Sequence, residues 1–185
     1  LAGVALGTEA GLAAALYYLL HSTLVSGGLF LLADVIARQR GDTASELISA
    51  PALKQPLLLG TLFFAGAISI AGLPPFSGFL GKVMLLRAVP PNIDAALLWP
   101  VILVGGLGML IALGRAGSMV FWRPSAAVSV GRAADNVRVS AAFGLLLGSV
   151  VLVVAAQPIQ AYVQAAAAQL FDLGPYLEIV RGHDL

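Results

Sequence analysis

The chain has 185 residues, of which 59% are hydrophobic and 10% are charged, and its mean hydropathy is +0.96. Soluble domains carry about 25% charged residues, so this composition predicts a membrane protein. The net charge of +1 provides no basic surface for nucleic acid, and the absence of cysteine excludes disulfides and thiolate metal sites. The two histidines, His21 and His183, are too few to form a zinc site.

The first residues, LAGVALGT, include no methionine and lack the basic start of a signal peptide. They read like the tail of a preceding membrane span. We therefore expect the chain to be the C-terminal part of a longer protein.

The apolar segments predict an all-α, polytopic transmembrane helix bundle over residues 1–157. A helix needs about 20 apolar residues to cross a bilayer core about 30 Å thick. Four segments meet this requirement, at about 11–36, 56–89, 95–121 and 139–156. The second is too long for one straight helix, and the sequence GLPPFSGFLG interrupts it near 73–81. We therefore expect one discontinuous helix in the bundle.

The third predicted span has a tryptophan near each end, Trp99 and Trp122. At 1.5 Å per residue, the two rings would lie roughly 34 Å apart along the helix axis. This separation matches the aromatic belts at the two membrane interfaces.

Basic residues gather in two of the predicted connections, whereas the PPNIDA turn between the second and third spans has none. Because Lys and Arg are enriched in cytoplasmic loops, both basic connections are predicted to be cytoplasmic. Residues 158–185 would then form an interfacial helix and an exposed tail on the outer, periplasmic side of a bacterial inner membrane. The basic residues are Arg38, Arg40 and Lys54 after the first span, and Arg123, Arg132 and Arg138 after the third.

His21 is an ionisable residue near the middle of the first predicted span. Such residues are costly in a bilayer and are usually functional. Histidine titrates near neutrality, and the hydroxyls of Tyr17, Ser22 and Ser26 could hold water beside it. A proton relay is therefore predicted, with a purely structural hydrogen bond to a neighbouring helix as the alternative.

Lys82 follows the interruption, seven residues after the second of two adjacent prolines, Pro74 and Pro75. The prolines remove two amide donors, and the freed carbonyls are tolerated only inside protein or beside a water-filled cavity. Transporters use such broken helices as ion sites, so we expect Lys82 to carry protons there. The alternative is a proline kink that only shapes the bundle. Gly78 and Gly81 would allow close helix approach at this hinge.

Two further charged residues are secondary candidates. Arg115 is expected to reach the cytoplasmic interface or to pair with an anionic group there, and Asp34 is expected to pair with Arg38 at i+4. The sequence has no nucleophile triad, phosphate loop or metal-ligand cluster. We therefore expect neither an enzyme active site nor a cofactor.

The segments YYLLHSTLVSGGLFLLADVI, SIAGLPPFSGFLGKVMLL and LIALGRAGSMVFWRP carry a family resemblance. They are similar to the antiporter-like membrane subunits of multisubunit cation/proton antiporters of the Mrp type and of proton-pumping NADH:quinone oxidoreductase. Within this family, the chain most resembles the D subunits of the Na⁺(K⁺)/H⁺ antiporters. The segments that carry this similarity are LADVIARQR, GLPPFSGFLGK and PYLEIVRG.

The resemblance implies a bundle built from two inverted repeats, of which this chain would be the later portion. It also implies that Lys82 matches the lysine of the second broken helix, and that His21 lies in the helix that supplies relay groups. Some relatives have a lysine four or five residues after this histidine, where this chain has Val25 and Ser26. Water or the hydroxyls of Ser22 and Ser26 would have to bridge that gap.

Three functions remain open from the sequence. The first is a membrane subunit of a secondary antiporter that exchanges Na⁺ or K⁺ for H⁺ through a buried polar axis, within a hetero-oligomeric complex. The second is a proton-translocating subunit of an NADH:quinone oxidoreductase-type complex. The third is a passive scaffold whose polar groups only hold neighbouring subunits. The detailed sequence of these segments favours the first function. It does not determine which cation is exchanged or the ratio of cations to protons.

Overall fold

The computed structural model describes residues 1–41, 48, 51–90, 95–122, 134–172, 174 and 177–178. Every regular element among them is a helix, which confirms the predicted all-α class. Seven α-helices and one π-helical turn follow each other along the described chain: α1 Ala2–Ala5, α2 Glu9–Arg40, α3 Pro56–Ala71, α4 Ser77–Arg87, α5 Ala95–Gly117, η2 Ser118–Trp122, α6 Asn136–Val154 and α7 Ala156–Phe171.

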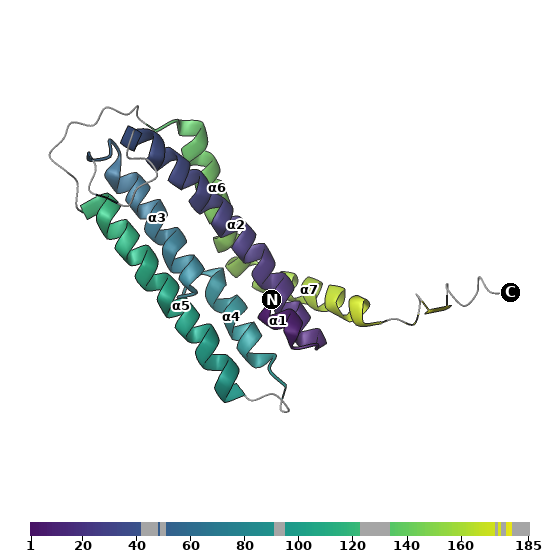
Figure 1. Cartoon of the computed structure of the whole chain (residues 1–185). Helices are drawn as coiled ribbons and strands as arrows, with labels where there is room; N and C mark the ends of the chain where they lie inside the picture. Colours follow the sequence, from purple (N-terminus) through teal and green to yellow (C-terminus); the bar gives the residue numbers. More distant parts are fainter. Residues whose placement is uncertain are drawn as a thin grey trace.

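The 32-residue α2 is the central helix of the bundle. It packs against α3, α4, α6 and α7, while α5 packs against α3 (Figure 1). α7 leaves the bundle at an angle near the first residues of α2. α2 also packs against α1, so its side chains face most of the other described helices.

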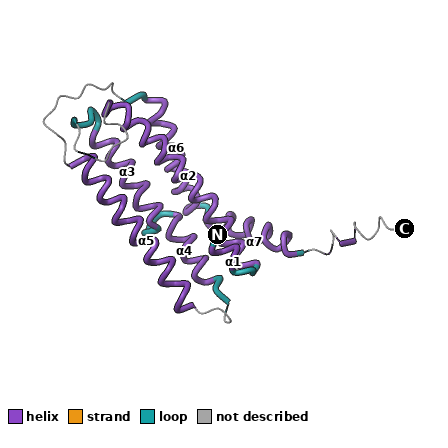
Figure 2. The backbone as a smooth tube through the Cα atoms, in the orientation of Figure 1, coloured by secondary structure: helices purple, strands orange, loops and turns teal. Residues whose placement is uncertain are grey.

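Three described helices are long and apolar enough to cross a membrane: Glu9–Arg40, Ala95–Trp122 and Asn136–Val154. α3 is also apolar but has only 16 residues, and α4 adds 11 more after the interruption. The second predicted span thus consists of two half-helices, which confirms the discontinuous helix. Figure 2 shows the short loop between them.

Gly72 ends α3, a role that the sequence analysis did not assign. Its φ of 76° lies in the left-handed region that favours glycine, and its N–H bonds to the carbonyl of Ser69 at 3.1 Å. The N–H of Leu73 bonds to the carbonyl of Ile68 at 3.1 Å, which completes a Schellman-type helix end. The prolines follow in the loop, and α4 begins at Ser77.

Apolar packing around α2 forms two clusters, with a polar layer between them. One cluster contains Val25, Leu32 and Leu146, and the other contains Tyr17 and Leu152 among its buried members. The polar layer therefore lies in a low-dielectric interior, where hydrogen bonds are strong and unpaired polar groups are costly.

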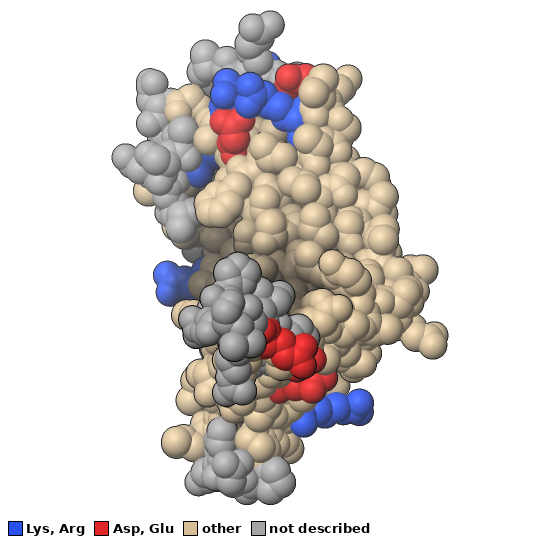
Figure 3. All heavy atoms as spheres, turned by 90° about the vertical axis from the view of Figure 1, so that its right-hand side faces the viewer, with Lys and Arg blue, Asp and Glu red and all other residues tan. Residues whose placement is uncertain are grey.

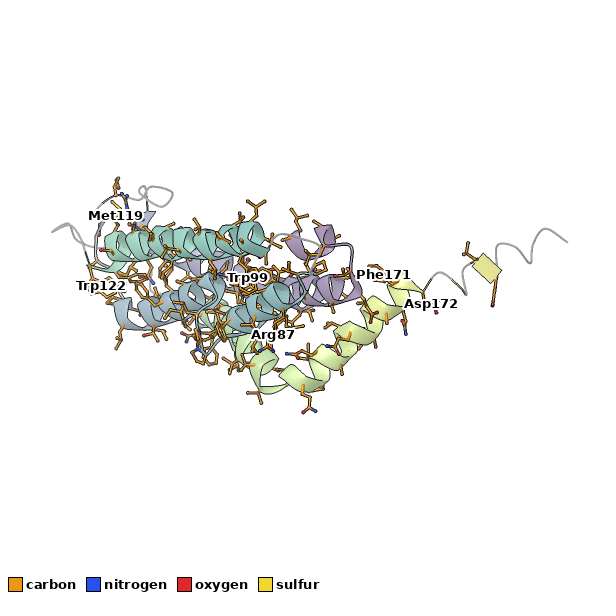
Figure 4. All side chains as sticks on the ribbon, turned by 90° about the horizontal axis from the view of Figure 1, so that it is seen from below. Arg87, Trp99, Met119, Trp122, Phe171 and Asp172 are labelled. Carbon is orange, nitrogen blue, oxygen red and sulfur yellow. The ribbon has the colours of Figure 1, made fainter. Side chains whose placement is uncertain are left out.

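α5 is the most exposed of the long helices, because none of its most apolar window is buried. The two tryptophans lie toward opposite ends of α5 and η2 (Figure 4), and the residues are 46% exposed at Trp99 and 68% exposed at Trp122. Figure 3 shows charged side chains near the upper end and in the lower half of one face, with a broad uncharged area between them. A surface of this kind suits contact with lipid or with other membrane helices.

Four basic residues gather at the end of the bundle where α2 stops and α6 starts. Arg38 and Arg40 lie in the last turn of α2, and Arg138 lies in the first turns of α6. Lys54 is held there by a bond from its backbone N–H to the side chain of Gln39, at 2.9 Å. The other basic residues used to predict the orientation, Arg123 and Arg132, lie outside the described residues.

Candidate functional site

Lys82 lies in the second turn of α4, and its side chain reaches back to the end of α3. Its ammonium group donates a hydrogen bond to the carbonyl of Ala71, the last residue of α3. This carbonyl is one of those that the interruption deprives of a helical partner. Two glycines make room for the side chain: a Cβ at Gly72 would lie 2.6 Å from Lys82 Cδ, and a Cβ at Gly106 of α5 would collide with Lys82 Nζ.

Two cavities meet at Lys82 and Gly106. The first, which we call the Ser22 cavity, measures about 400 Å³ and is also lined by Tyr18 and Ser22 of α2. The second, the Pro74 cavity, measures about 310 Å³ and lies between the loop, α4 and α5. Each is large enough for several water molecules, whose share of liquid volume is about 30 Å³ each. The ammonium group is thus within reach of two spaces that could hold water.

His21 is fully buried where α2 faces the start of α4. Its Nδ1 lies 2.8 Å from the hydroxyl of Ser77, and its ring meets that of Tyr18 edge-on, with centroids 5.4 Å apart. Its Nε2 has no hydrogen-bond partner among the described residues and lies against Gly78. The imidazole therefore has one nitrogen with a hydrogen-bond partner and one nitrogen without a partner among the described residues.

Three buried serines continue from His21 into the bundle. The hydroxyl of Ser77 lies 2.9 Å from that of Ser149 on α6, which in turn lies 2.8 Å from that of Ser69 on α3. None of the three serines is more than 1% exposed. A continuous hydroxyl chain therefore connects His21 on α2 with α4, α6 and α3.

The other hydroxyls predicted for the pathway do not join this chain. Tyr17 is buried and donates to the carbonyl of Leu152 at 3.0 Å, so it ties α2 to α6. Ser22 bonds to the carbonyl of Leu19 in its own helix at 3.1 Å and lines the cavity that Lys82 also lines. Ser26 is half-buried one turn further along α2.

The hinge glycines lie inside α4, whereas Pro74 and Pro75 lie in the loop before it. A Cβ at Gly78 would collide with the carbonyl oxygen of Ser69, and one at Gly81 would lie 2.9 Å from the ring of Tyr18. These glycines therefore set how closely α4 approaches α3 and α2.

The two secondary candidates lie away from this polar layer. Asp34 accepts hydrogen bonds from Arg38 at 2.9 and 3.1 Å, as the i+4 spacing predicts, and it also pairs with Arg138 of α6. Arg115 is exposed on α5. Asp34 therefore connects two helices at the basic end of the bundle.

The family model described as NADH:quinone oxidoreductase/Mrp antiporter, TM, matches residues 1–111, which include α1 to α4 and most of α5. The chain belongs to this family. It is therefore a multi-pass membrane protein. Its broken helix and Lys82 both lie within the matched residues.

Individual members of the NADH:quinone oxidoreductase/Mrp antiporter family are also similar. The chain is 34% identical to the D subunit of the Na(+)/H(+) antiporter of Bacillus subtilis (strain 168) over 182 residues, which are 96% of this chain and 36% of the relative. It is 32% identical to the D subunit of the probable K(+)/H(+) antiporter of Rhizobium meliloti (strain 1021), over 66% of this chain and 28% of the relative. The chain thus spans a minor part of the length of these curated relatives.

A solved member of the family shares the fold. The structure of the Mrp complex from Dietzia sp. DQ12-45-1b matches with a TM-score of 0.78 and 26% identity, over 95% of this chain and 41% of that chain. The helix arrangement around Lys82 is therefore that of an Mrp antiporter membrane subunit.

The residues that the sequence analysis missed in this antiporter-family chain are Ser69, Ser77 and Ser149. Ser69 and Ser77 flank the interruption in SIAGLPPFS, and Ser149 is the only hydroxyl between Ser140 and Tyr162. A lone hydroxyl in an apolar span is a weak signal, because serine can bond to its own helix. Within the part of the chain that the structure describes, no group of three or more His, Cys, Asp or Glu could hold a metal ion.

Proposed function

We propose that this chain is part of the D subunit of an Mrp-type secondary antiporter that exchanges Na⁺ or K⁺ for H⁺, and we call that whole subunit the parent protein. It acts with other subunits in a hetero-oligomeric complex of the bacterial inner membrane, as a transporter component and not as an enzyme. The basic end of the bundle faces the cytoplasm, and the C-terminus lies on the outer side. The names of the two relatives and the matched Mrp complex support this assignment.

The observation that carries the proposal is the position of Lys82. Its ammonium group bonds to a carbonyl freed by the helix interruption and lines two cavities. An ionisable group at a break in a membrane helix is the arrangement expected of an ion site. In this proposal protons pass between Lys82, water in the Ser22 cavity and His21. His21 is not among the residues that line this cavity, but its ring packs against Tyr18, which lines it together with Ser22.

The second candidate function is a proton-translocating subunit of an NADH:quinone oxidoreductase-type complex. This candidate is supported by the description of the matching family model, which names NADH:quinone oxidoreductase beside the Mrp antiporter. It uses the same buried groups but takes its energy from a redox reaction in other subunits.

The two functions are separated by cation-dependent proton movement. Everted vesicles from cells without their own antiporters would contain the full-length parent complex and an acid interior set up by respiration. We expect added Na⁺ or K⁺ to dissipate the pH gradient, as measured with a fluorescent amine. Vesicles that respond to neither cation, but show NADH-driven proton uptake that needs this protein, would establish the second function instead.

The Asp34 ion pairs give a smaller prediction. We expect Asp34→Asn to lower the melting temperature of the purified parent complex by about 1 °C, because exposed ion pairs stabilise proteins only weakly. Cation-driven proton movement should stay unchanged, since Asp34 lies at the end of the bundle. Asp172→Asn is the matched control, because its carboxylate accepts a local bond from Gly174 N–H at 3.0 Å. Loss of proton movement at an unchanged melting temperature would instead place Asp34 on the path.

A further inference from the structure

His21 has a fixed partner on one side of its ring only. Nδ1 lies 2.8 Å from the Ser77 hydroxyl, whereas Nε2 is buried and lacks a partner among the described residues. A buried polar atom without a partner is costly and calls for an explanation. The asymmetry distinguishes the two nitrogens chemically.

The Ser77 hydroxyl is itself linked to two further helices, directly to α6 and through α6 to α3. It bonds to Ser149 of α6, and Ser149 bonds to Ser69 in the last turns of α3. Ser77 is the first residue of α4, so the chain of hydroxyls spans the interruption from one half-helix to the other. The position of the imidazole is thereby tied to both halves of the broken helix.

Hydroxyl groups can serve either protonation state of a histidine. Each has one hydrogen to donate and two lone pairs to accept with, whereas a neutral imidazole donates from one nitrogen and an imidazolium from both. If Nε2 takes up and releases the proton, Nδ1 keeps its own hydrogen in both charge states. Ser77 then accepts from Nδ1–H in both, while its hydrogen points to Ser149 and that of Ser149 points to Ser69. The chain of hydroxyls therefore keeps one arrangement while the ring gains and loses its charge.

We propose that Ser77, backed by Ser149 and Ser69, is a positioning residue for His21: it keeps Nδ1 bonded in both charge states and leaves Nε2 as the nitrogen that exchanges the transported proton. This inference rests on the proposed function, because it assigns a role within the same proton path. Ser77, Ser149 and Ser69 thus support the proton path by positioning His21, and they do not themselves carry the proton.

The first test reads the histidine directly and needs no transport. The full-length parent complex, labelled with ¹⁵N-histidine and placed in lipid, is studied by solid-state NMR, and the His21 signals are those lost in His21→Gln. We expect Ser77→Ala to shift the Nδ1 signal and Ser77→Thr, which keeps the hydroxyl, to restore it. Ser140→Ala is the matched control, because its hydroxyl bonds to the Val137 carbonyl on the exposed side of α6. An unshifted Nδ1 signal in Ser77→Ala would overturn the proposal.

The second test measures proton movement in the everted vesicles at equal amounts of assembled complex. Losing the hydroxyl should slow cation-driven proton movement about tenfold in Ser77→Ala, since a buried group loses its partner. The double variant with His21→Gln should be no slower than His21→Gln alone, because Ser77 acts through the ring. A further loss in the double variant would show an independent structural role and overturn the proposal.

A third variant keeps the proposal testable if Ser77→Ala does not assemble. Ser149→Ala removes the second hydroxyl of the chain and should shift the same Nδ1 signal, whereas an unshifted signal would again overturn the proposal. A parent complex without cation-driven proton movement would disprove the proposed function, and the NMR result would still decide the role of Ser77.

Discussion

Replacing Lys82 by alanine should reduce cation-driven proton movement by the parent complex to background, a loss of about 100-fold or more, as for other positioned proton-transfer groups. The variant removes the ammonium group that bonds to the Ala71 carbonyl and lines both cavities. No other Lys, Arg or His among the described residues lines the Ser22 or the Pro74 cavity. The measurement is the dissipation of the pH gradient in everted vesicles after addition of Na⁺ or K⁺.

Two variants serve as controls for this prediction. Lys54→Ala removes an exposed lysine at the basic end of the bundle and should leave proton movement intact. Lys82→Arg keeps a positive charge that does not release its proton, so it should be nearly as inactive as Lys82→Ala. If Lys82→Ala and the unmutated complex move protons equally fast at equal assembly, Lys82 has a structural role. That result would favour the passive scaffold over the transport function.

Replacing Gly106 by alanine should slow proton movement about tenfold or more, because small displacements of a reacting group have large effects on rate. The added methyl group would occupy the place of Lys82 Nζ and would lie 3.2 Å from the Ala71 carbonyl oxygen. The lysine side chain is flexible, so it would yield and leave its partner. Lys82 and residue 106, which line both the Ser22 cavity and the Pro74 cavity, would then pack differently.

Gly105→Ala is the matched control for Gly106→Ala. Gly105 is the preceding residue of α5, it lines the Ser22 cavity, and a Cβ there would meet nothing within 4 Å. Both variants add one methyl group to the same helix, so a general effect on α5 would appear in both. Equal rates for the two variants, measured in the same vesicles, would contradict the view that Gly106 positions Lys82.

Local features of the sequence were sufficient to predict the helical class and the interruption. Hydropathy over about 20 residues marks a span whatever its neighbours are, and two adjacent prolines remove backbone donors wherever they occur. The same reasoning singled out Lys82 and His21, because a charge in an apolar run is visible without knowledge of its contacts. It included Gly72 as the first residue of GLPPFSGFLG but did not predict that its left-handed conformation ends α3.

The partners of those charged groups depended on the tertiary structure. Ser149 is 80 residues from Ser69 and 72 from Ser77 in sequence, and only the packing of α6 beside both half-helices brings the three hydroxyls together. Tyr17 was predicted to hydrate the histidine, yet its hydroxyl bonds to the carbonyl of Leu152. Serine and tyrosine hydroxyls bond to whatever acceptor the packing offers, so their roles cannot be predicted from local sequence.

What the sequence by itself determined is therefore where the chain is helical, where the helix breaks and which residues carry charge in an apolar setting. These properties follow from the transfer of each segment out of water and from backbone geometry, and both are local. Only the tertiary structure decided that the ammonium of Lys82 bonds to the end of α3 against Gly106, and that His21 has one bonded and one unpartnered nitrogen among the described residues. Hydrogen bonds and close packing act over a few ångströms between side chains from different helices, so they exist only once the helices have assembled.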